Sequence, residues 1–341
     1  MSSRFKNPRA HHNFVGRTCS ITGVGSYVPE KILTNAELEK MVETTDEWIT
    51  TRTGIKERRI AAADEFTSDL ATKAAERAMK MAGIKAHQIN LIIVATLTPD
   101  MPFPSTACLV QRKIGALNAA AFDIEAACSG FIYALEIGMQ FITSHTYETV
   151  LVIGAEKLSS IVNWKDRNTC VLFGDGAGAA ILQNRPNSHG LLTAVMGADG
   201  NKADLLSMPG GGSACPATPE SVAQGLHYLR MDGKETFKNA VNAMVSAANE
   251  AMRRCEIDIT KIKCVIPHQA NQRIISAVGE RLGTTEEQLF VNLHKYGNTS
   301  AASVAIALDE AVSSGKISRG DLILLVVFGA GLTWGAAVIE W

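Results

Sequence analysis

The stretch Ala126-Ala127-Cys128-Ser129-Gly130-Phe131 joins an apolar run over residues 119–124 to residues 131–143, where apolar side chains recur every three or four positions. This change of period predicts a buried strand, a tight turn and then a helix. Cys128 would lie at the helix N-terminus, where backbone N–H groups stabilise negative charge, so we expect a lowered thiol pKa and a nucleophilic role. The alternative is a small buried hydrophobe, the usual role of a lone cysteine.

The composition is that of a globular protein with a large core. Of 341 residues, 46% are hydrophobic and 20% are charged, which fits two domains or one large layered unit. The net charge of -1 gives no electrostatic reason to expect nucleic acid or a membrane surface as a partner. The seven cysteines are scattered without a C-x-x-C pair, which favours a cytoplasmic protein over a disulfide framework or a zinc site.

Residues 1–18 are polar and basic and lack the apolar segment of a secretory signal, so a flexible tail is expected there. The adjacent His11 and His12 have no partners at ligand spacing, so no metal site is expected. No apolar run approaches the roughly 20 residues that a membrane-spanning helix needs.

A hidden repeat relates the two ends of the chain. When the sequence is shifted by 173 positions, residues 78–93 match residues 251–266 in a helix-to-strand pattern, and Cys128 falls on Ala301. This many matches in one register indicate a duplication of one structural unit.

The same repeat lays the strand that ends at Gly154 on the strand that ends at Gly329, after a two-residue adjustment. The chain is therefore expected to consist of two similar α/β halves, residues 19–185 and 225–341, joined by a connecting region, residues 186–224. The halves would pack against each other, and a single site would lie where they meet.

Two residues of the second half are candidates to join Cys128 at this seam. His268 directly follows a predicted strand, residues 263–267, and α/β sites are generally built at the carboxyl ends of such strands. Asn298 lies in a Gly-Asn-Thr-Ser turn before a predicted helix, residues 301–312. The alternatives are a histidine that is satisfied within the core and an asparagine that caps a helix or forms a turn.

Together, Cys128, His268 and Asn298 suit acyl-thioester chemistry. A thiolate attacks a thioester carbonyl and takes over the acyl group. The imidazole N–H and the asparagine amide, two neutral donors, then stabilise the enolate that forms when a malonyl thioester loses CO₂. Cysteine proteases combine the same residue types, but a protease needs the imidazole as a base, and its fold would lack the duplicated pattern.

Two glycine-rich stretches receive different interpretations. Gly329, Ala330 and Gly331 follow an apolar strand, and their N–H groups would complete an oxyanion hole with that of Cys128. Residues 174–178 lack both the full dinucleotide-binding register and a phosphate-loop lysine, so a bend between strands is expected there.

Trp48 and Arg52 are four residues apart, so at helical spacing they share one face. An indole plane beside a guanidinium suits a planar anionic ligand such as a nucleotide. The alternative is that the tryptophan belongs to the core and the arginine to the solvated surface.

Over residues 19–341 the sequence resembles the beta-ketoacyl-acyl carrier protein synthase III family of thiolase-fold condensing enzymes. The motifs that carry the resemblance are Ala127-Cys128-Ser129-Gly130-Phe131, His268-Gln269-Ala270-Asn271, Gly297-Asn298-Thr299-Ser300 and Gly329-Ala330-Gly331-Leu332-Thr333-Trp334-Gly335. The resemblance implies an α/β protein with a five-layered αβαβα fold from two duplicated halves, a homodimer and no cofactor.

The resemblance also implies a two-step reaction. An acyl group, by default acetyl, passes from acyl-CoA to Cys128 and then condenses with malonyl-acyl carrier protein. The products are 3-oxoacyl-acyl carrier protein and CO₂, and the reaction initiates type II fatty acid synthesis. His268 and Asn298 match the family's decarboxylation pair.

Further positions carry over by motif to the binding of the two substrates. Trp48, Arg52 and Arg167 match the residues that grip the CoA adenine and phosphates. Asn271 matches a pantetheine contact, and Arg273 matches a residue that docks the acyl carrier protein.

The resemblance also covers the acyl pocket. Phe103 matches a side chain that reaches into the partner subunit's acyl pocket, and Met231, Gly233 and Phe237 fall in the pocket and tunnel segment. Residues 209–225 look longer than the family's connection at this place and lead into that segment, so the acyl primer is left open.

Three alternatives remain from the sequence. A related condensing enzyme would use a different primer for a secondary metabolite or a biotin precursor. A non-catalytic partner of a condensing enzyme would keep the fold, but such proteins typically lose the nucleophile. A Cys-His hydrolase would release free acid in place of a 3-oxoacyl product.

Overall fold

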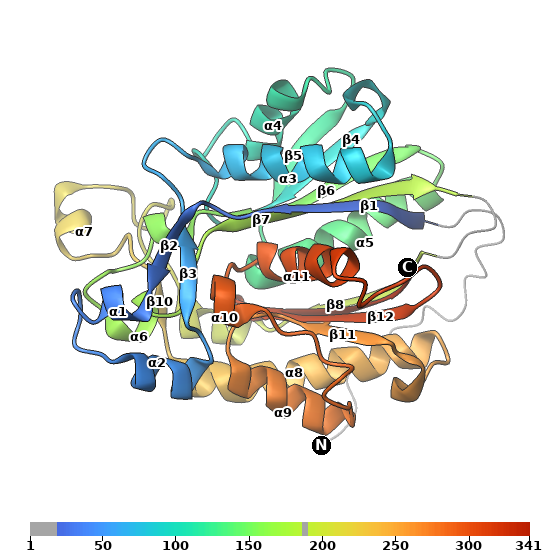
Figure 1. Ribbon diagram of the computed structural model, residues 1–341. Helices are drawn as coiled ribbons and strands as arrows, with labels where there is room; N and C mark the ends of the chain where they lie inside the picture. Colours follow the sequence, from blue (N-terminus) through green and yellow to red (C-terminus); the bar gives the residue numbers. More distant parts are fainter. Residues whose placement is uncertain (1–18, 186–189) are drawn as a thin grey trace.

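The computed structural model describes residues 19–185 and 190–341, and the tail expected over residues 1–18 lies outside the described residues. Two sheets alternate with three layers of helices, which confirms the predicted five-layered αβαβα architecture (Figure 1). The first sheet has the order β1-β7-β6-β4-β5, with β1 (Cys19–Tyr27), β4 (Leu91–Ala95), β5 (Ala120–Ile124), β6 (Thr149–Glu156) and β7 (Gly176–Asn184). The second has the order β11-β12-β13-β8, with β8 (Leu191–Ala198), β11 (Cys264–Pro267), β12 (Leu322–Gly329) and β13 (Thr333–Glu340).

The two sheets have the same topology. Read as β8-β13-β12-β11, the second sheet repeats β1-β7-β6-β4, with two antiparallel pairs followed by a parallel pair. β4 begins at Leu91 and β11 begins at Cys264, 173 positions later. Beside β11, the counterpart of β5 is an isolated parallel bridge between Val265 and Leu289.

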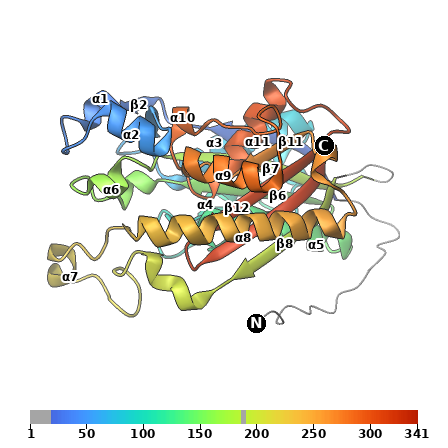
Figure 2. The same cartoon turned by 90° about the horizontal axis from the view of Figure 1, so that it is seen from below.

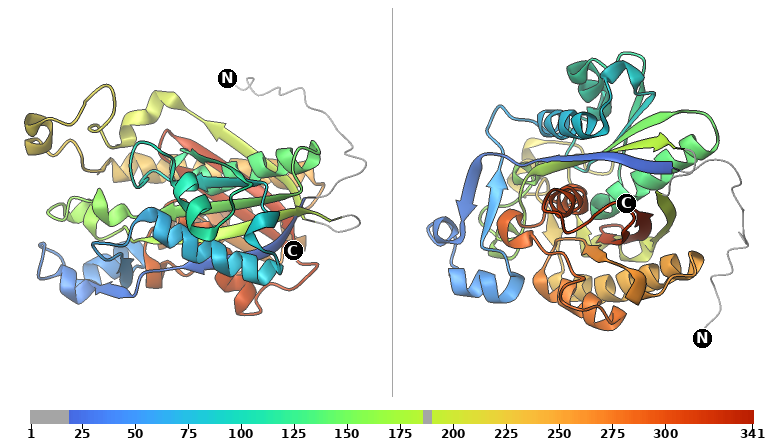
Figure 3. Two further views of the ribbon diagram at one scale, coloured as in Figure 1. Left: turned by 90° about the horizontal axis from the view of Figure 1, so that it is seen from above. Right: turned by 45° about the vertical axis from the view of Figure 1, so that its right-hand side comes forward.

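Helices α5 (Gly130–Thr143) and α11 (Ala302–Ser313) form the central layer. Figure 3 shows α11, the red helix of its right panel, almost end-on between the sheets. Both helices are apolar on most sides because each meets a sheet above and below. Phe131, Leu135 and Leu308 are buried in one core with strand residues of both sheets, so this layer joins the two halves.

The outer faces of the sheets are covered by two pairs of helices. α3 (Thr67–Ala82) and α4 (Thr106–Ile114) cover the first sheet, and α8 (Gly233–Arg254) and α9 (Gln272–Leu282) cover the second, side by side in Figure 2. Alternate residues of β4 enter different cores: Ile93 packs in the central core and Ile92 packs with α3. Burial on both faces explains why such strands read as continuous apolar runs.

Glycines let the central helix α11 approach the first sheet closely. A Cβ atom added at Gly154 of β6 would lie 2.4 Å from the carbonyl oxygen of Ala301, and one at Gly178 of β7 would lie 2.5 Å from the Cβ of Ala305. Neither position has room for a larger residue, so these glycines set the spacing between the halves.

The short elements gather at one end of the sheets, at the left of Figure 1. They are β2 (Lys31–Thr34), α1 (Asn35–Leu38), α2 (Asp46–Thr53), β3 (Glu57–Ile60), α6 (Arg167–Cys170), β9 (Leu206–Ser207), α7 (Pro219–Ala223), β10 (Arg230–Met231) and α10 (Leu293–Tyr296). The stretch 209–225 contains α7 and projects away from the layers. Within residues 19–185 and 190–341, no helix combines the length and the apolarity needed to cross a membrane.

The elements predicted around the candidate residues are confirmed to within one residue at each end. α5 begins at Gly130, β11 begins at Cys264 and α11 begins at Ala302. The expected bend over residues 174–178 is wrong for most of its length. β7 already begins at Gly176, because its backbone pairs with both β1 and β6.

Candidate active site

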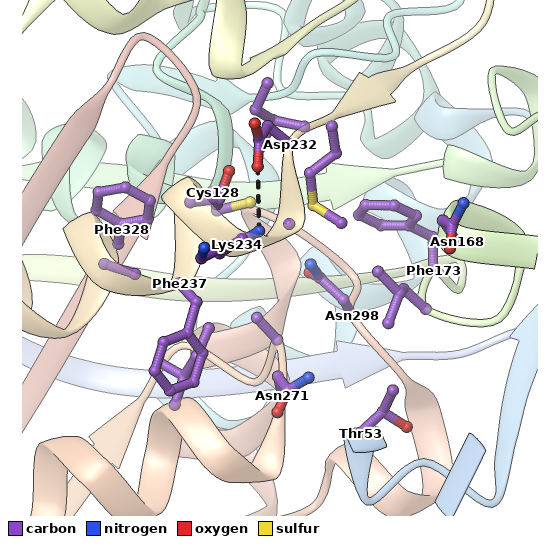
Figure 4. A pocket seen from close by; sticks show the side chains of 18 of the residues that line it. Thr53, Cys128, Asn168, Phe173, Asp232, Lys234, Phe237, Asn271, Asn298 and Phe328 are labelled. Atoms are coloured by element: carbon purple, nitrogen blue, oxygen red, sulfur yellow. Dashed lines mark hydrogen bonds between the residues drawn. The ribbon is translucent and has the colours of Figure 1, made fainter. Parts of the chain in front are cut away.

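Cys128 lies in the turn between β5 and α5, within a short 3-10 helix, Ala127–Ser129. Ala127 has a φ of 45°, in the left-handed region that residues other than glycine rarely adopt. Its N–H donates a hydrogen bond of 2.8 Å to Glu125 Oε1, which holds this conformation. The turn places the buried Cys128 side chain on the wall of a cavity (Figure 4).

Burial, and not the helix N-terminus, dominates the ionisation of this thiol. Removal from water is the main cause that raises the pKa of Cys128 to about 12. The carboxyl groups of Glu156 and Glu125 act in the same direction, whereas Ser300 and a backbone N–H act against it. The lowered thiol pKa expected from the sequence is therefore wrong for this structure, in which the thiol is protonated near pH 7.

His268 follows β11 directly and lines the same cavity. Its backbone N–H donates to the carbonyl of Val326 over 2.7 Å, and its Nδ1 lies 2.6 Å from Ser303 Oγ in the first turn of α11. Burial lowers the pKa of His268 to about 3, so the ring is neutral near pH 7. Because Nδ1 is engaged, Nε2 is the nitrogen that remains for a substrate.

Asn298 lies between Gly297, whose φ is 65°, and the start of α11, and it forms a parallel bridge with Phe173. Its Oδ1 accepts the N–H of Ser300 over 2.8 Å, which leaves the Nδ2 amino group to donate. Figure 4 shows the Asn298 side chain pointing toward the space that Cys128 faces.

The glycine-rich segment after β12 lies directly against the cysteine turn. A Cβ atom at Gly329 would lie 2.7 Å from the backbone nitrogen of Cys128, so this contact requires glycine. Thr333 Oγ1 lies 3.0 Å from the carbonyl oxygens of both Ala126 and Ala330, which holds the segment to the turn. The two halves of the chain thus meet backbone to backbone beside the thiol.

One cavity of about 970 Å³ extends from Cys128 to exposed side chains such as Arg52. Its lining contains eleven of the residues that the sequence singled out: Trp48, Arg52, Cys128, Met231, Gly233, Phe237, His268, Asn271, Arg273, Asn298 and Gly329. Ala330, Gly331, Arg167 and Phe103 lie outside this lining. In the part of the chain that the structure describes, no group of His, Cys, Asp or Glu side chains is arranged to hold a metal.

The residues expected to grip CoA lie together on α2 and α6. The guanidinium carbon of Arg52 lies 4.7 Å from the centre of the Trp48 ring, and that of Arg167 lies 5.1 Å from it. Arg167 also donates to the carbonyl of Glu43 over 2.9 Å. Two guanidinium groups therefore contact one indole, and Arg167, which does not line the cavity itself, contacts Trp48, which does.

Asn271 and Arg273 connect α9 to the rest of the cavity. Asn271 caps α9, since its Oδ1 accepts the N–H of Arg273 over 2.8 Å, and its Nδ2 donates to the carbonyl of Arg52 over 3.1 Å. The Arg273 guanidinium lies 5.8 Å from the ring centre of Phe237 on α8. Asn271 thus holds α9 against α2, and an exposed cation lies beside it.

Phe103 lies in the loop between β4 and α4 and is 84% exposed. An aromatic side chain this exposed buries little of its surface against its own chain. The expectation that Phe103 enters the pocket of a partner subunit stays a prediction.

Two buried residues beside the site were not found from the sequence. Ser303 is one, and its contact with His268 requires the fold. Glu156, at the end of β6, is fully buried and accepts hydrogen bonds from Thr98 Oγ1 (2.5 Å) and the N–H of Leu97 (3.2 Å). Burial raises the pKa of Glu156 to about 7. An acidic residue in an otherwise apolar strand was the signal available for Glu156.

Fold and site together define a class of protein. A duplicated five-layered α/β fold carries a cysteine at the start of a central helix of its first half. A neutral histidine and an oriented asparagine from the second half face the same cavity. This combination is that of a thiolase-fold condensing enzyme.

Comparisons with known proteins identify the family. Residues 122–200 match the family described as 3-oxoacyl-[acyl-carrier-protein (ACP)] synthase III, and residues 252–341 match the C-terminal part of the same family. The beta-ketoacyl-[acyl-carrier-protein] synthase III of Caldanaerobacter subterraneus subsp. tengcongensis is 60% identical over 321 residues, which cover 94% of this chain and 97% of that protein.

Solved structures agree with this assignment. The 3-oxoacyl-[acyl-carrier-protein] synthase III of Aquifex aeolicus VF5 matches with a TM-score of 0.88 and 50% identity, over 95% of this chain and 100% of that one. The priming beta-ketosynthase of the R1128 polyketide biosynthetic pathway matches with a TM-score of 0.88 and 36% identity, over 95% and 96% of the two chains. The chain belongs to the beta-ketoacyl-[acyl-carrier-protein] synthase III family, the acyltransferase-type condensing enzymes of fatty acid biosynthesis.

Proposed function

We propose that this enzyme condenses an acyl-CoA primer, by default acetyl-CoA, with malonyl-acyl carrier protein and so initiates type II fatty acid synthesis. The observation that carries the proposal is the convergence of Cys128, His268 and Asn298 on one cavity. The ring of His268 is neutral and the amide of Asn298 is oriented as a donor, which is what the second step of such a reaction requires.

In the first step, the sulfur of Cys128 attacks the thioester carbonyl carbon of acyl-CoA. The new S–C bond forms as the bond to the CoA sulfur breaks, and the thiol proton ends on the departing CoA. The backbone N–H of Cys128 and the segment that begins at Gly329 stabilise the oxyanion between these events. Burial raises the pKa of Cys128 to about 12, so the thiol enters this step protonated and loses its proton as it attacks.

In the second step, the thioester oxygen of malonyl-acyl carrier protein accepts hydrogen bonds from His268 Nε2 and Asn298 Nδ2. Loss of CO₂ leaves its electron pair on the α-carbon, and the enolate oxygen is held by these two donors. The carbanion attacks the acyl-Cys128 carbonyl, a C–C bond forms and the cysteine sulfur leaves. Neutral donors suit this step, because a cation would stabilise the carboxylate that has to be lost.

The outer part of the cavity supports the assignment of CoA as donor. The adenine would lie against Trp48 with Arg52 and Arg167 close to its phosphates, since both guanidinium groups already flank the indole. Asn271 would contact the pantetheine arm inside the cavity. The exposed Arg273 would pair with the acidic carrier protein.

A homodimer in the cytoplasm completes the proposal. Phe103 would reach the partner subunit's acyl pocket, and the exposure of Phe103 and Met101 supports such an interface. The free cysteines of the described chain suit a reducing compartment.

The test follows the intact mass of the protein after mixing with a panel of acyl-CoAs and again after malonyl-acyl carrier protein is added. The expected result is one acyl group on Cys128 that then leaves as a 3-oxoacyl product. An absent adduct, or release only as free acid, would overturn the proposal.

A second candidate differs only in the primer. The similarity to a priming ketosynthase of a polyketide pathway supports, as the alternative, a condensing enzyme that uses a different primer for a secondary metabolite. The same donor panel decides between them, because the acyl-CoA with the highest kcat/KM identifies the primer.

A further inference from the structure

The hydroxyl of Ser303 contacts Nδ1, one of the two ring nitrogens of His268. The distance from His268 Nδ1 to Ser303 Oγ is 2.6 Å, and the two residues are only 4% and 2% exposed. Among the described residues, this is the side-chain hydrogen bond that His268 makes. Since bulk water does not reach the pair, the state of Nδ1 depends on Ser303.

The second contact of Ser303 Oγ indicates the direction of this hydrogen bond. The backbone N–H of Gln269 donates to Ser303 Oγ over 3.5 Å. Within the described chain, the hydroxyl oxygen has these two contacts, and a backbone N–H can only donate. If Nδ1 also donated to this oxygen, the buried hydroxyl proton would have no acceptor among these contacts, and buried polar hydrogens are almost always paired. We therefore assign the hydroxyl as the donor and His268 Nδ1 as the acceptor.

A neutral imidazole carries a single ring proton, and burial keeps His268 neutral. When Nδ1 accepts from Ser303, that proton resides on Nε2, the nitrogen left for the cavity. The opposite tautomer would turn a lone pair toward the enolate oxygen and repel it. The hydrogen bond pattern thus selects the tautomer that can donate.

We propose that Ser303 is a positioning residue that holds His268 as the Nε2–H tautomer and thereby makes it a donor in the decarboxylation step. This inference rests on the proposed function, because it concerns the donor of that function's second step. It gives Ser303 no part in the transfer of the acyl group to Cys128.

The equivalent position of the first half shows that the hydroxyl is not a requirement of the scaffold. Gly130 lies 173 positions before Ser303, also in the first turn of a central helix. A Cβ atom at Gly130 would lie 2.9 Å from the Cβ of Ala95, so the fold excludes a side chain there. The hydroxyl belongs to the half that carries His268.

The kinetic test compares S303A with S303T, which keeps a hydroxyl, and with S314A, a matched change at the other end of α11, where Ser314 Oγ donates to the carbonyl of Ala311. In S303A we expect acylation of Cys128 at the wild-type rate and condensation slowed about 10- to 100-fold, in line with losses seen when a histidine loses its orienting partner. S303T should recover most of the rate, and S314A should match the wild type. Equal condensation rates for S303A and the wild type would overturn the inference.

A spectroscopic test needs no turnover. In ¹⁵N-histidine-labelled protein, with the His268 signals assigned from their loss in H268Q, we expect a protonated Nε2 and an unprotonated Nδ1. A protonated Nδ1 would overturn the inference. This measurement is made on the wild type, so it remains valid even if S303A fails to fold. Failure of the wild type to form acyl-Cys128 would instead overturn the proposed function, so the two failures are distinguishable.

Discussion

The two halves of this protein share one topology but contribute different chemistry. Cys128 and Ala301 occupy equivalent positions, 173 residues apart, at the starts of the central helices α5 and α11. In the first half this position holds the thiol. In the second half it holds an inert methyl group, while Asn298 and Ser303 on either side of it face or organise the cavity.

The strand glycines show the same exchange between halves. Gly154 of β6 lies against the backbone of Ala301, and Gly329 of β12 lies against that of Cys128. In each half, a strand glycine therefore packs against the start of the central helix of the other half. In the proposed mechanism this scaffold is used twice, with the first half capturing the acyl group and the second half stabilising the enolate.

The largest effect is expected when the chemistry of the first half is removed. C128A should form no acyl adduct and should lose condensation activity by more than about 10³-fold, because no other nucleophile replaces the thiol. Product formation from acyl-CoA and malonyl-acyl carrier protein measures this loss. C255A, a half-buried cysteine at the end of α8, is the control and should keep its activity. Acyl transfer by C128A would contradict the assignment.

The structural equivalence of the halves can be tested by a matched pair. Leu135 and Leu308 are 173 positions apart, and both are 0% exposed in the central core. L135A and L308A should each lower the free energy of unfolding by about 2–5 kcal/mol, and by similar amounts. Urea unfolding at one fixed protein concentration measures both. L117A, at a residue that is 75% exposed, should change the free energy of unfolding little. A large decrease in L117A would undermine the comparison.

Glu156 is expected to make stability depend on pH. Burial raises its folded pKa from 4.5 to about 7, so the folded state binds the proton more tightly than the unfolded state. The stabilisation that Glu156 gives by binding this proton is therefore fully present at low pH. It is lost as the pH rises from the unfolded to the folded pKa, which lowers the free energy of unfolding by about 3 kcal/mol in total. The difference in unfolding free energy between wild type and E156Q, measured at pH 5 and pH 8, should shift in favour of E156Q at pH 8. An unchanged difference would contradict this, and E280Q, at an exposed position of α9, is the control.

The smallest effect is expected at the outer end of the cavity. W48A removes the indole that Arg52 and Arg167 share, and should raise the KM for acyl-CoA about tenfold with little change in kcat. Steady-state kinetics measure both constants, and the KM for malonyl-acyl carrier protein is the internal control. A fall in kcat without a change in KM would place Trp48 in a different role.

Periodicity and the internal repeat were sufficient to predict two similar α/β halves and to place Cys128, His268 and Asn298 at the seam between them. The five-layered arrangement and most other cavity residues were predicted from the resemblance to the family. Helix starts and strand ends depend on local sequence, and a repeat makes weak local patterns confirm one another. The positions of Cys128 before α5, of His268 after β11 and of Asn298 before α11 followed from such patterns.

Properties that depend on contacts between distant segments of the chain were not predictable in the same way. A helix N-terminus is visible in sequence, but the burial that raises the pKa of Cys128 is produced by residues of both halves. Ser303 and His268 are 35 positions apart, and nothing in that spacing indicates a hydrogen bond. Arg167 likewise reaches Trp48 only because α6 folds beside α2.

The division of labour between the halves is tested most directly by the intact mass of H268A after mixing with acyl-CoA and then with malonyl-acyl carrier protein. We predict that H268A gains one acyl group on Cys128, as the wild type does, and still carries it after malonyl-acyl carrier protein has been added. Failure of H268A to become acylated, or release of its acyl group as a 3-oxoacyl product at the wild-type rate, would contradict this division.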